Sequence, residues 1–107
     1  MQARTVGMLV LAAAFVAAGT ARAQDIAHGK AIADTWCSNC HRVGAEEQRT
    51  GRDTAPPFSS IARMQSTTEA SLAAFLSTTH GGMPNLALSR REIRDVSAYI
   101  LSLRAPR

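Results

Sequence analysis

The sequence contains few of the residues that small domains use to cross-link themselves or to bind nucleic acid. Its 107 residues include two cysteines, one lysine, one tryptophan and one tyrosine. The cysteines lie three positions apart, so a disulfide between them would close too short a loop to stabilise the chain. The arginines are scattered, and no basic stripe is interleaved with aromatic residues, which argues against nucleic acid as a partner. The stability of the domain must therefore have another source.

The longest apolar run lies at the N-terminus and is short for a membrane-spanning helix. Val6 to Ala18 is 13 residues long, whereas a transmembrane helix needs ~20. Arg4 precedes the run, and Ala21-Arg22-Ala23 follows it with the small-x-small pattern of a cleavage site. We therefore expect residues 1–23 to be a cleaved secretory signal peptide, with export to the periplasm and no stable membrane insertion. The alternative is a segment that stays attached as an anchor.

The mature chain is predicted to be one small domain, residues 24–107. Without Arg4 and Arg22, the twelve basic residues fall to ten against eight acidic ones, so the formal charge drops from +4 to +2. A domain of this size buries only about 60 % of the surface that its unfolded chain exposes, and it usually needs a disulfide, a metal or a cofactor. Since a disulfide framework is excluded, we expect a cofactor to complete the core.

The hydrophobic pattern predicts an all-α fold, because no segment alternates apolar and polar residues as a strand does. Asp25 can cap a first helix that runs from about Ile26 into the cysteine motif. A short helix follows around Phe58. Two long loops, residues 43–57 and the loop around Met83, interrupt the helices, and loops of this length in a small domain usually wrap a ligand.

Two capping boxes predict where the last two helices begin. Ser66-x-x-Glu69 opens a third helix and Ser89-x-x-Glu92 opens a fourth. Apolar residues recur one turn apart along the fourth helix and predict a single buried stripe. The stripe consists of Ile93, Val96, Ile100 and Leu103.

The strongest chemical motif is WCSNCHR, residues 36–42. Cys37-x-x-Cys40-His41 has the spacing of c-type haem attachment. In that chemistry the two thiols add to the two vinyl groups of the haem, and the histidine lies beneath the iron and ligates it. The motif predicts one haem c (heme c), attached through Cys37 and Cys40 and ligated by His41. A large, flat, apolar macrocycle would also supply the core that the chain is too short to build.

Two other uses of a C-x-x-C motif fit the chain less well. A redox dithiol expects a βαβ context, which the helical pattern lacks. A structural zinc site needs four ligands, commonly from a second C-x-x-C or His-x₃-His pair. Apart from the motif, only His28 and His80 remain as nitrogen ligands.

The second axial position of the iron decides between two functions. A sixth ligand from the protein favours electron transfer, whereas an open site favours gas binding or oxygen chemistry. Met83, in HGGMPN, is the favoured candidate, because two glycines allow a close backbone approach and Pro84 stiffens the loop. His80 and Met64 remain alternatives, as does the absence of a protein ligand. Each also has a simpler structural role: His80 could pair with the last carbonyls of the third helix, and Met64 could fill the core. His28 is predicted to be a solvated surface residue.

These motifs together resemble the small class I c-type cytochromes of bacteria, from about Asp25 to Leu103. Gly29 matches the place where the family's first helix packs closely on the last, and Tyr99 matches the aromatic residue that crosses it. The segment APPF, residues 55–58, is similar to the family's Gly-Pro-x-aromatic segment, although alanine replaces the glycine and a second proline follows directly. This similarity implies that the carbonyl of Pro56 accepts a hydrogen bond from Nδ1 of His41. Met83-Pro84 matches the family's methionine ligand loop.

The resemblance implies a small cytochrome c fold, with about four helices wrapped around one covalently attached haem. The function it implies is that of a monomeric, non-enzymatic periplasmic electron carrier of a respiratory chain, with His41 and Met83 as iron ligands. Its partners would be redox proteins: a dehydrogenase, a bc-type complex, an oxidase or a reductase. The alternative is a haem enzyme or gas-binding cytochrome with an open sixth site. Trp36 is expected to pack against the macrocycle or the last helix, and Arg52 and Arg63 are candidates for the haem propionates.

Overall fold

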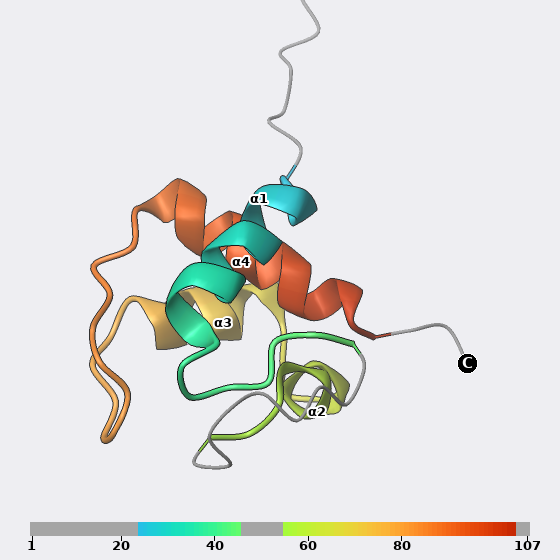
Figure 1. The fold of residues 1–107 in the computed structure, drawn as a ribbon, viewed down its shortest axis with the longest axis horizontal. Helices are drawn as coiled ribbons and strands as arrows, with labels where there is room; N and C mark the ends of the chain where they lie inside the picture. Colours follow the sequence, from blue (N-terminus) through green and yellow to red (C-terminus); the bar gives the residue numbers. More distant parts are fainter. Residues whose placement is uncertain (1–23, 46–54, 105–107) are drawn as a thin grey trace, which may run out of the picture.

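The computed structural model describes residues 24–45 and 55–104, and the fold within them is all-α, as predicted (Figure 1). The elements are α1 (Ile26–Ile32), the π-helical turn η1 (Ala33–Cys37), α2 (Phe58–Arg63), α3 (Glu69–Leu76) and α4 (Arg90–Ser102). Within these ranges there is no strand, only an isolated bridge between His80 and Met83. The predicted signal peptide lies outside the described residues. In the part that is described, no helix is long and apolar enough to cross a membrane.

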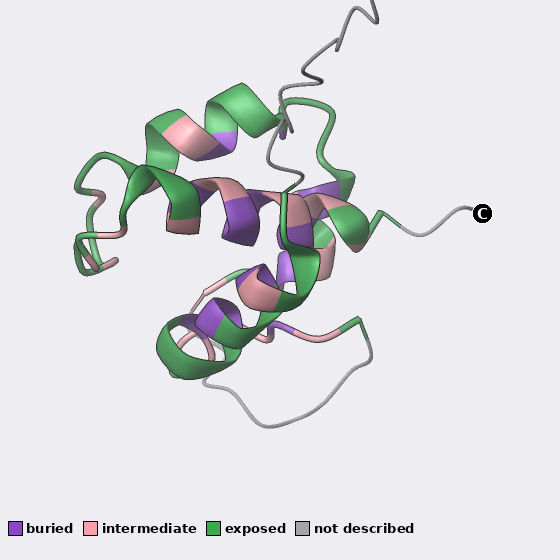
Figure 2. Ribbon diagram, turned by 90° about the horizontal axis from the view of Figure 1, so that it is seen from above, coloured by how far each residue is buried: buried purple, intermediate pink, exposed green. Residues whose placement is uncertain are grey.

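The longest helix, α4, is the element on which α1, α2 and α3 all pack (Figure 1). It begins where the sequence predicted, because Ser89 and Glu92 form the capping box: the Ser89 side chain accepts from the Glu92 N–H at 3.1 Å, and the Glu92 side chain accepts from the Ser89 N–H at 2.7 Å. Its buried side faces the other helices (Figure 2). Three members of the predicted stripe are buried, whereas Leu103, the residue that ends the helix, is only partly buried.

The crossing of α1 and α4 is a backbone contact at Gly29. A Cβ placed on this residue would lie 2.0 Å from the carbonyl oxygen of Asp95 and 2.9 Å from the nitrogen of Val96. The predicted close crossing at Gly29 is thus confirmed. Tyr99 lies one turn further along α4, is buried, and donates its hydroxyl to the carbonyl of Val43 at 2.5 Å. The ring therefore ties α4 to the segment that follows the cysteine motif.

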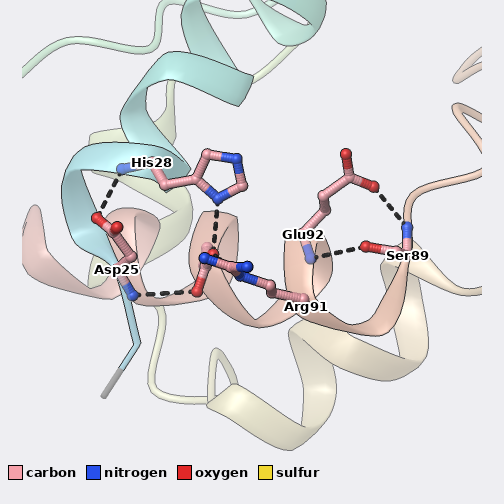
Figure 3. A network of polar contacts seen from close by, with 6 residues as sticks. Asp25, His28, Ser89, Arg91 and Glu92 are labelled. Carbon is pink, nitrogen blue, oxygen red and sulfur yellow. Dashed lines mark hydrogen bonds and ion pairs between the residues drawn. The ribbon is translucent and has the colours of Figure 1, made fainter. Parts of the chain in front are cut away.

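A network of hydrogen bonds and ion pairs lies beside this crossing (Figure 3). The side chain of Asp95 is only 4 % exposed. It accepts hydrogen bonds from the backbone N–H of Asp25 at 3.0 Å and from Nδ1 of His28 at 2.7 Å, and Nε of Arg91 lies 3.7 Å away. Burial disfavours the ionised carboxyl, but these hydrogen bonds and positive charges outweigh it and hold the pKa of Asp95 below its ordinary value. The prediction that His28 is merely a solvated residue is therefore wrong.

The third helix starts later than the sequence predicted. Its N-cap is Thr68 rather than Ser66, and the capping box closes with Ser71. Thr68 has the extended backbone of an N-cap, φ −128° and ψ 167°, and so places Glu69 first in the helix instead of third. The helix therefore keeps a reciprocal cap, but hydroxyls form it on both sides.

The guanidinium of Arg104, just after α4, holds the connection between α2 and α3. It donates to the backbone carbonyls of Ala62, Met64 and Thr67. These three carbonyls lie at or beyond the C-terminal end of α2, where no helical N–H follows to pair with them, and the guanidinium supplies the missing hydrogen-bond donors. This clamp positions one wall of the cavity described below.

We expect Gly29→Ala to destabilise the protein by about 2 kcal/mol or more, because the new methyl group must push two helix backbones apart. Helix propensity alone would change stability in the opposite direction, by up to ~1 kcal/mol. Urea unfolding followed by circular dichroism measures the difference. Lys30→Ala, an exposed substitution in the same helix, is the control and should change stability by no more than about 0.5 kcal/mol. A more stable Gly29→Ala protein would contradict the close crossing.

We expect Asp95→Asn to cost about 1–3 kcal/mol at neutral pH, because the carboxylate that accepts the hydrogen bonds loses its charge. The pKa of Asp95 is lower in the folded than in the unfolded protein, so its contribution is complete above the ordinary aspartate pKa of about 4 and disappears as the pH falls through the folded-state value. The difference between variant and wild type, from urea unfolding between about pH 2 and 7, should shrink accordingly. Asp34→Asn, in an exposed pair with Lys30, is the control; an equal effect there would refute the assignment.

Candidate functional site

The cysteine motif forms a single tight turn at the end of the first helix. Through η1 the helix widens, and the N–H of Ser38 reaches back five residues to the carbonyl of Ala33 at 3.0 Å. The carbonyl of Cys37 then accepts from the N–H groups of both Cys40 (3.2 Å) and His41 (2.9 Å). The carbonyl of Cys37 thus holds Cys40 and His41 in one turn through their N–H groups. The sequence predicted a helix running into the motif but not its π-helical end, for which spacing gives no signal; such widened turns often occur at functional sites.

The two thiols are free and differ in their surroundings. Cys37 is buried, whereas Cys40 is partly exposed. Burial raises the pKa of Cys37 to about 11. This thiol is therefore protonated at neutral pH. Nowhere in residues 24–45 and 55–104 do three His, Cys, Asp or Glu side chains cluster as they would to hold a metal.

His41 has one ring nitrogen engaged and the other available. Its Nδ1 lies 2.7 Å from the carbonyl oxygen of Pro56, the contact that the family resemblance predicted. Because a carbonyl can only accept, Nδ1 carries the proton, and Nε2 keeps the lone pair that a metal ligand requires. The N–H of Phe58 donates to the carbonyl of Arg42 at 2.9 Å and so holds the proline segment beside the histidine segment. The replacement of glycine by Ala55 has not prevented this geometry.

Two adjoining cavities open beside the motif, with volumes of about 400 and 410 Å³. Both are lined by Cys37, His41, Pro56 and Met83, together with apolar side chains from α2, α3 and the loop before α4. Within residues 24–45 and 55–104, no Lys, Arg, Asp or Glu side chain lines either cavity. Volumes in this range are those of cofactor sites. A large flat apolar group beside two thiols and an imidazole fits this space.

Met83 reaches both cavities from a constrained turn. Its N–H donates to the carbonyl of His80 at 3.1 Å, and Gly82, the third residue of the turn, has φ +80°. A type II turn requires a positive φ at this position, which glycine adopts without strain. Gly82 is therefore explained by the turn itself. A Cβ on Gly81 would meet no protein atom within 4 Å, so contacts within the described protein do not require a glycine there.

The other candidate ligands lie in different settings. Met64 lines the first cavity only and is 52 % exposed, so the prediction that it fills the core is wrong. The prediction that His80 pairs with the last carbonyls of α3 is wrong. Its ring instead stacks on Phe75, with centroids 3.6 Å apart and planes at 22°. His28 is engaged by Asp95. Trp36 is 57 % exposed and lines the second cavity, which is one of the two positions expected for it.

Arg63, one of the two arginines proposed for the propionates, is not among the residues that line the two cavities. Arg63 and Arg42 line a separate pocket of about 160 Å³. The other proposed arginine, Arg52, lies outside the described residues.

Two comparisons with known proteins identify the family of the chain. A family model described as "Cytochrome C oxidase, cbb3-type, subunit III" matches residues 24–100. Cytochrome c-552 of Bradyrhizobium diazoefficiens is 39 % identical over 98 residues, which cover 92 % of this chain and 93 % of that relative. No solved structure matches the chain. With a haem-attachment motif, an all-α fold and a relative matched over nearly its whole length, this chain belongs to the small c-type cytochromes.

Proposed function

We propose that this cytochrome is a one-electron carrier whose haem is attached through Cys37 and Cys40 and ligated by His41 and Met83. One observation carries the proposal: His41, whose Nε2 keeps its lone pair, and Met83, in a constrained turn, both line the two cavities that Cys37 lines, and Cys40 joins them in the second. When bound, haem c supplies a reversible one-electron couple at its iron.

The residues around the site hold the two ligands and exclude water. The carbonyl of Pro56 orients the imidazole of His41 through Nδ1 and makes Nε2 a stronger metal ligand. The thioether of Met83 favours the ferrous state and raises the reduction potential. The apolar walls built from α3, α4 and the connecting loop would surround a haem bound here and limit the access of solvent to its iron.

The expected cellular setting follows from the N-terminal pattern. We propose removal of residues 1–23 on export and action in the periplasm, between redox proteins such as a dehydrogenase or bc-type complex and an oxidase or reductase. A non-enzymatic role and a monomeric state complete this proposal. Among the residues that the structure describes, those that wall the cavity beside Cys40 are uncharged and include Asn39 and Trp36, which suits brief contacts with more than one partner.

The visible spectrum of the purified protein, oxidised and reduced, tests the ligation. A His–Met carrier should show sharp reduced α and β bands, no reaction with carbon monoxide at moderate pH, and the weak far-red band of ferric Met–Fe ligation. The mass of the denatured protein should include one haem. A high-spin spectrum that responds to carbon monoxide would instead support the gas-binding or enzymatic alternative.

Met83→Ala should abolish the far-red band, lower the reduction potential and open the site to carbon monoxide, because the thioether ligand is lost. Met64→Leu is the matched control: it removes the other methionine that lines the first cavity and should leave the band and the carbon monoxide response unchanged. An unaltered spectrum and potential in Met83→Ala would show that another group, or none, is the sixth ligand.

A further inference from the structure

We propose that the stack of Phe75 and His80 is a positioning device that holds Met83 at the iron. The inference rests on the proposed ligation by Met83 and adds two residues to it. Neither ring is proposed to bind the metal. Their role is to tie the ligand turn to the end of α3.

The loop from α3 to α4 has few polar ties to the rest of the described protein. Between residues 79 and 88, the recorded hydrogen bonds are local: the Met83 N–H to the His80 carbonyl, the Ala87 N–H to the Asn85 side chain, and a 3.4 Å contact between His80 Nδ1 and Thr78. No hydrogen bond joins these residues to another helix within the described ranges. The position of the loop therefore depends on packing.

Packing holds the loop on both sides of Met83. After it, Leu86 and Leu88 contact the core cluster. Before it, the ring of His80 lies on the ring of Phe75, at 3.6 Å between centroids and nearly parallel. Phe75 itself lines both cavities beside Met83. The stack therefore joins the loop to α3 at the wall of the proposed haem site.

The stack is mechanically connected to Met83 by one turn. The carbonyl of His80 accepts from the N–H of Met83, and Gly82 supplies the positive φ that closes the turn. Placing the His80 ring therefore places the Met83 backbone three residues later. The connection runs from α3 through Phe75 and His80 to the thioether. Loss of either ring should release the turn and weaken the Met–Fe bond without unfolding the helices.

Imidazole binding to the ferric holoprotein measures how easily Met83 is displaced. We expect Phe75→Leu and His80→Ala each to bind imidazole about 2- to 10-fold more tightly than the wild type, which is the range a single aromatic pair supports. The far-red band should weaken in both. The double variant should gain little beyond either single change, because the two rings act as one unit.

Conservative variants separate stacking from other roles. Phe75→Tyr and His80→Phe keep two stacked rings and should restore wild-type imidazole affinity and band intensity. Thr78→Val removes the hydroxyl near Nδ1 and should have no effect. If Phe75 acted only by touching the haem, Phe75→Leu and His80→Ala would add independently in the double variant, and the positioning role would be overturned.

The failure of this inference is distinguishable from that of the proposed function. A wild-type protein without the far-red band would overturn Met83 ligation and the positioning role together. A wild-type protein with the band, whose Phe75→Leu and His80→Ala forms bind imidazole no more tightly, would overturn the positioning role alone. Both rings are partly exposed, and circular dichroism of each variant checks that the helices remain folded.

Discussion

The backbone contact between Gly29 and Asp95 is the constraint on which the rest of the structure depends. It allows α1 and α4 to cross without an intervening side chain, and η1 and the cysteine motif continue directly from α1. The same α4 presents Val96 and Ile100 to the cavity. The distance between the haem-attachment turn and the opposite wall is thus set at a single glycine. Any added atom there would move the thiols relative to the apolar wall.

Near the crossing of α1 and α4, hydrogen bonds of buried or partly buried polar side chains join segments of the chain. Asp95 is buried yet fully engaged, because the N-terminus of α1, His28 and Arg91 all face it. Arg104 similarly satisfies three carbonyls between α2 and α3. Each cluster joins segments that are distant in the sequence, and neither Asp95 nor Arg104 is among the residues that line the cavities. The cavity walls can therefore remain uncharged while the helices are still held together.

The features that the sequence predicted without the family resemblance are patterns of neighbouring residues, although one such pattern, the Ser66–Glu69 capping box, was wrong. The Ser89–Glu92 capping box and the buried stripe of α4 are local patterns, and both were found. The His41–Pro56 contact and the Gly29 crossing came only through family resemblance. The His28–Asp95 pair joins residues 67 positions apart, and the Phe75–His80 stack follows no helical repeat. Neither a period nor a motif encodes such contacts, so only the fold reveals them.

The two proposed iron ligands are held by different kinds of interaction, and this asymmetry has a chemical consequence. His41 follows a helical turn, and its ring is oriented by a hydrogen bond to a segment that is paired with its own neighbour Arg42. Met83 lies in a loop held by packing and one internal turn. Segments with few hydrogen bonds to the rest of a protein open more readily than helices do. For the proposed ligation, exchange of an axial ligand should therefore begin on the methionine side, while His41 and the proposed thioether bonds at Cys37 and Cys40 would keep the haem in place.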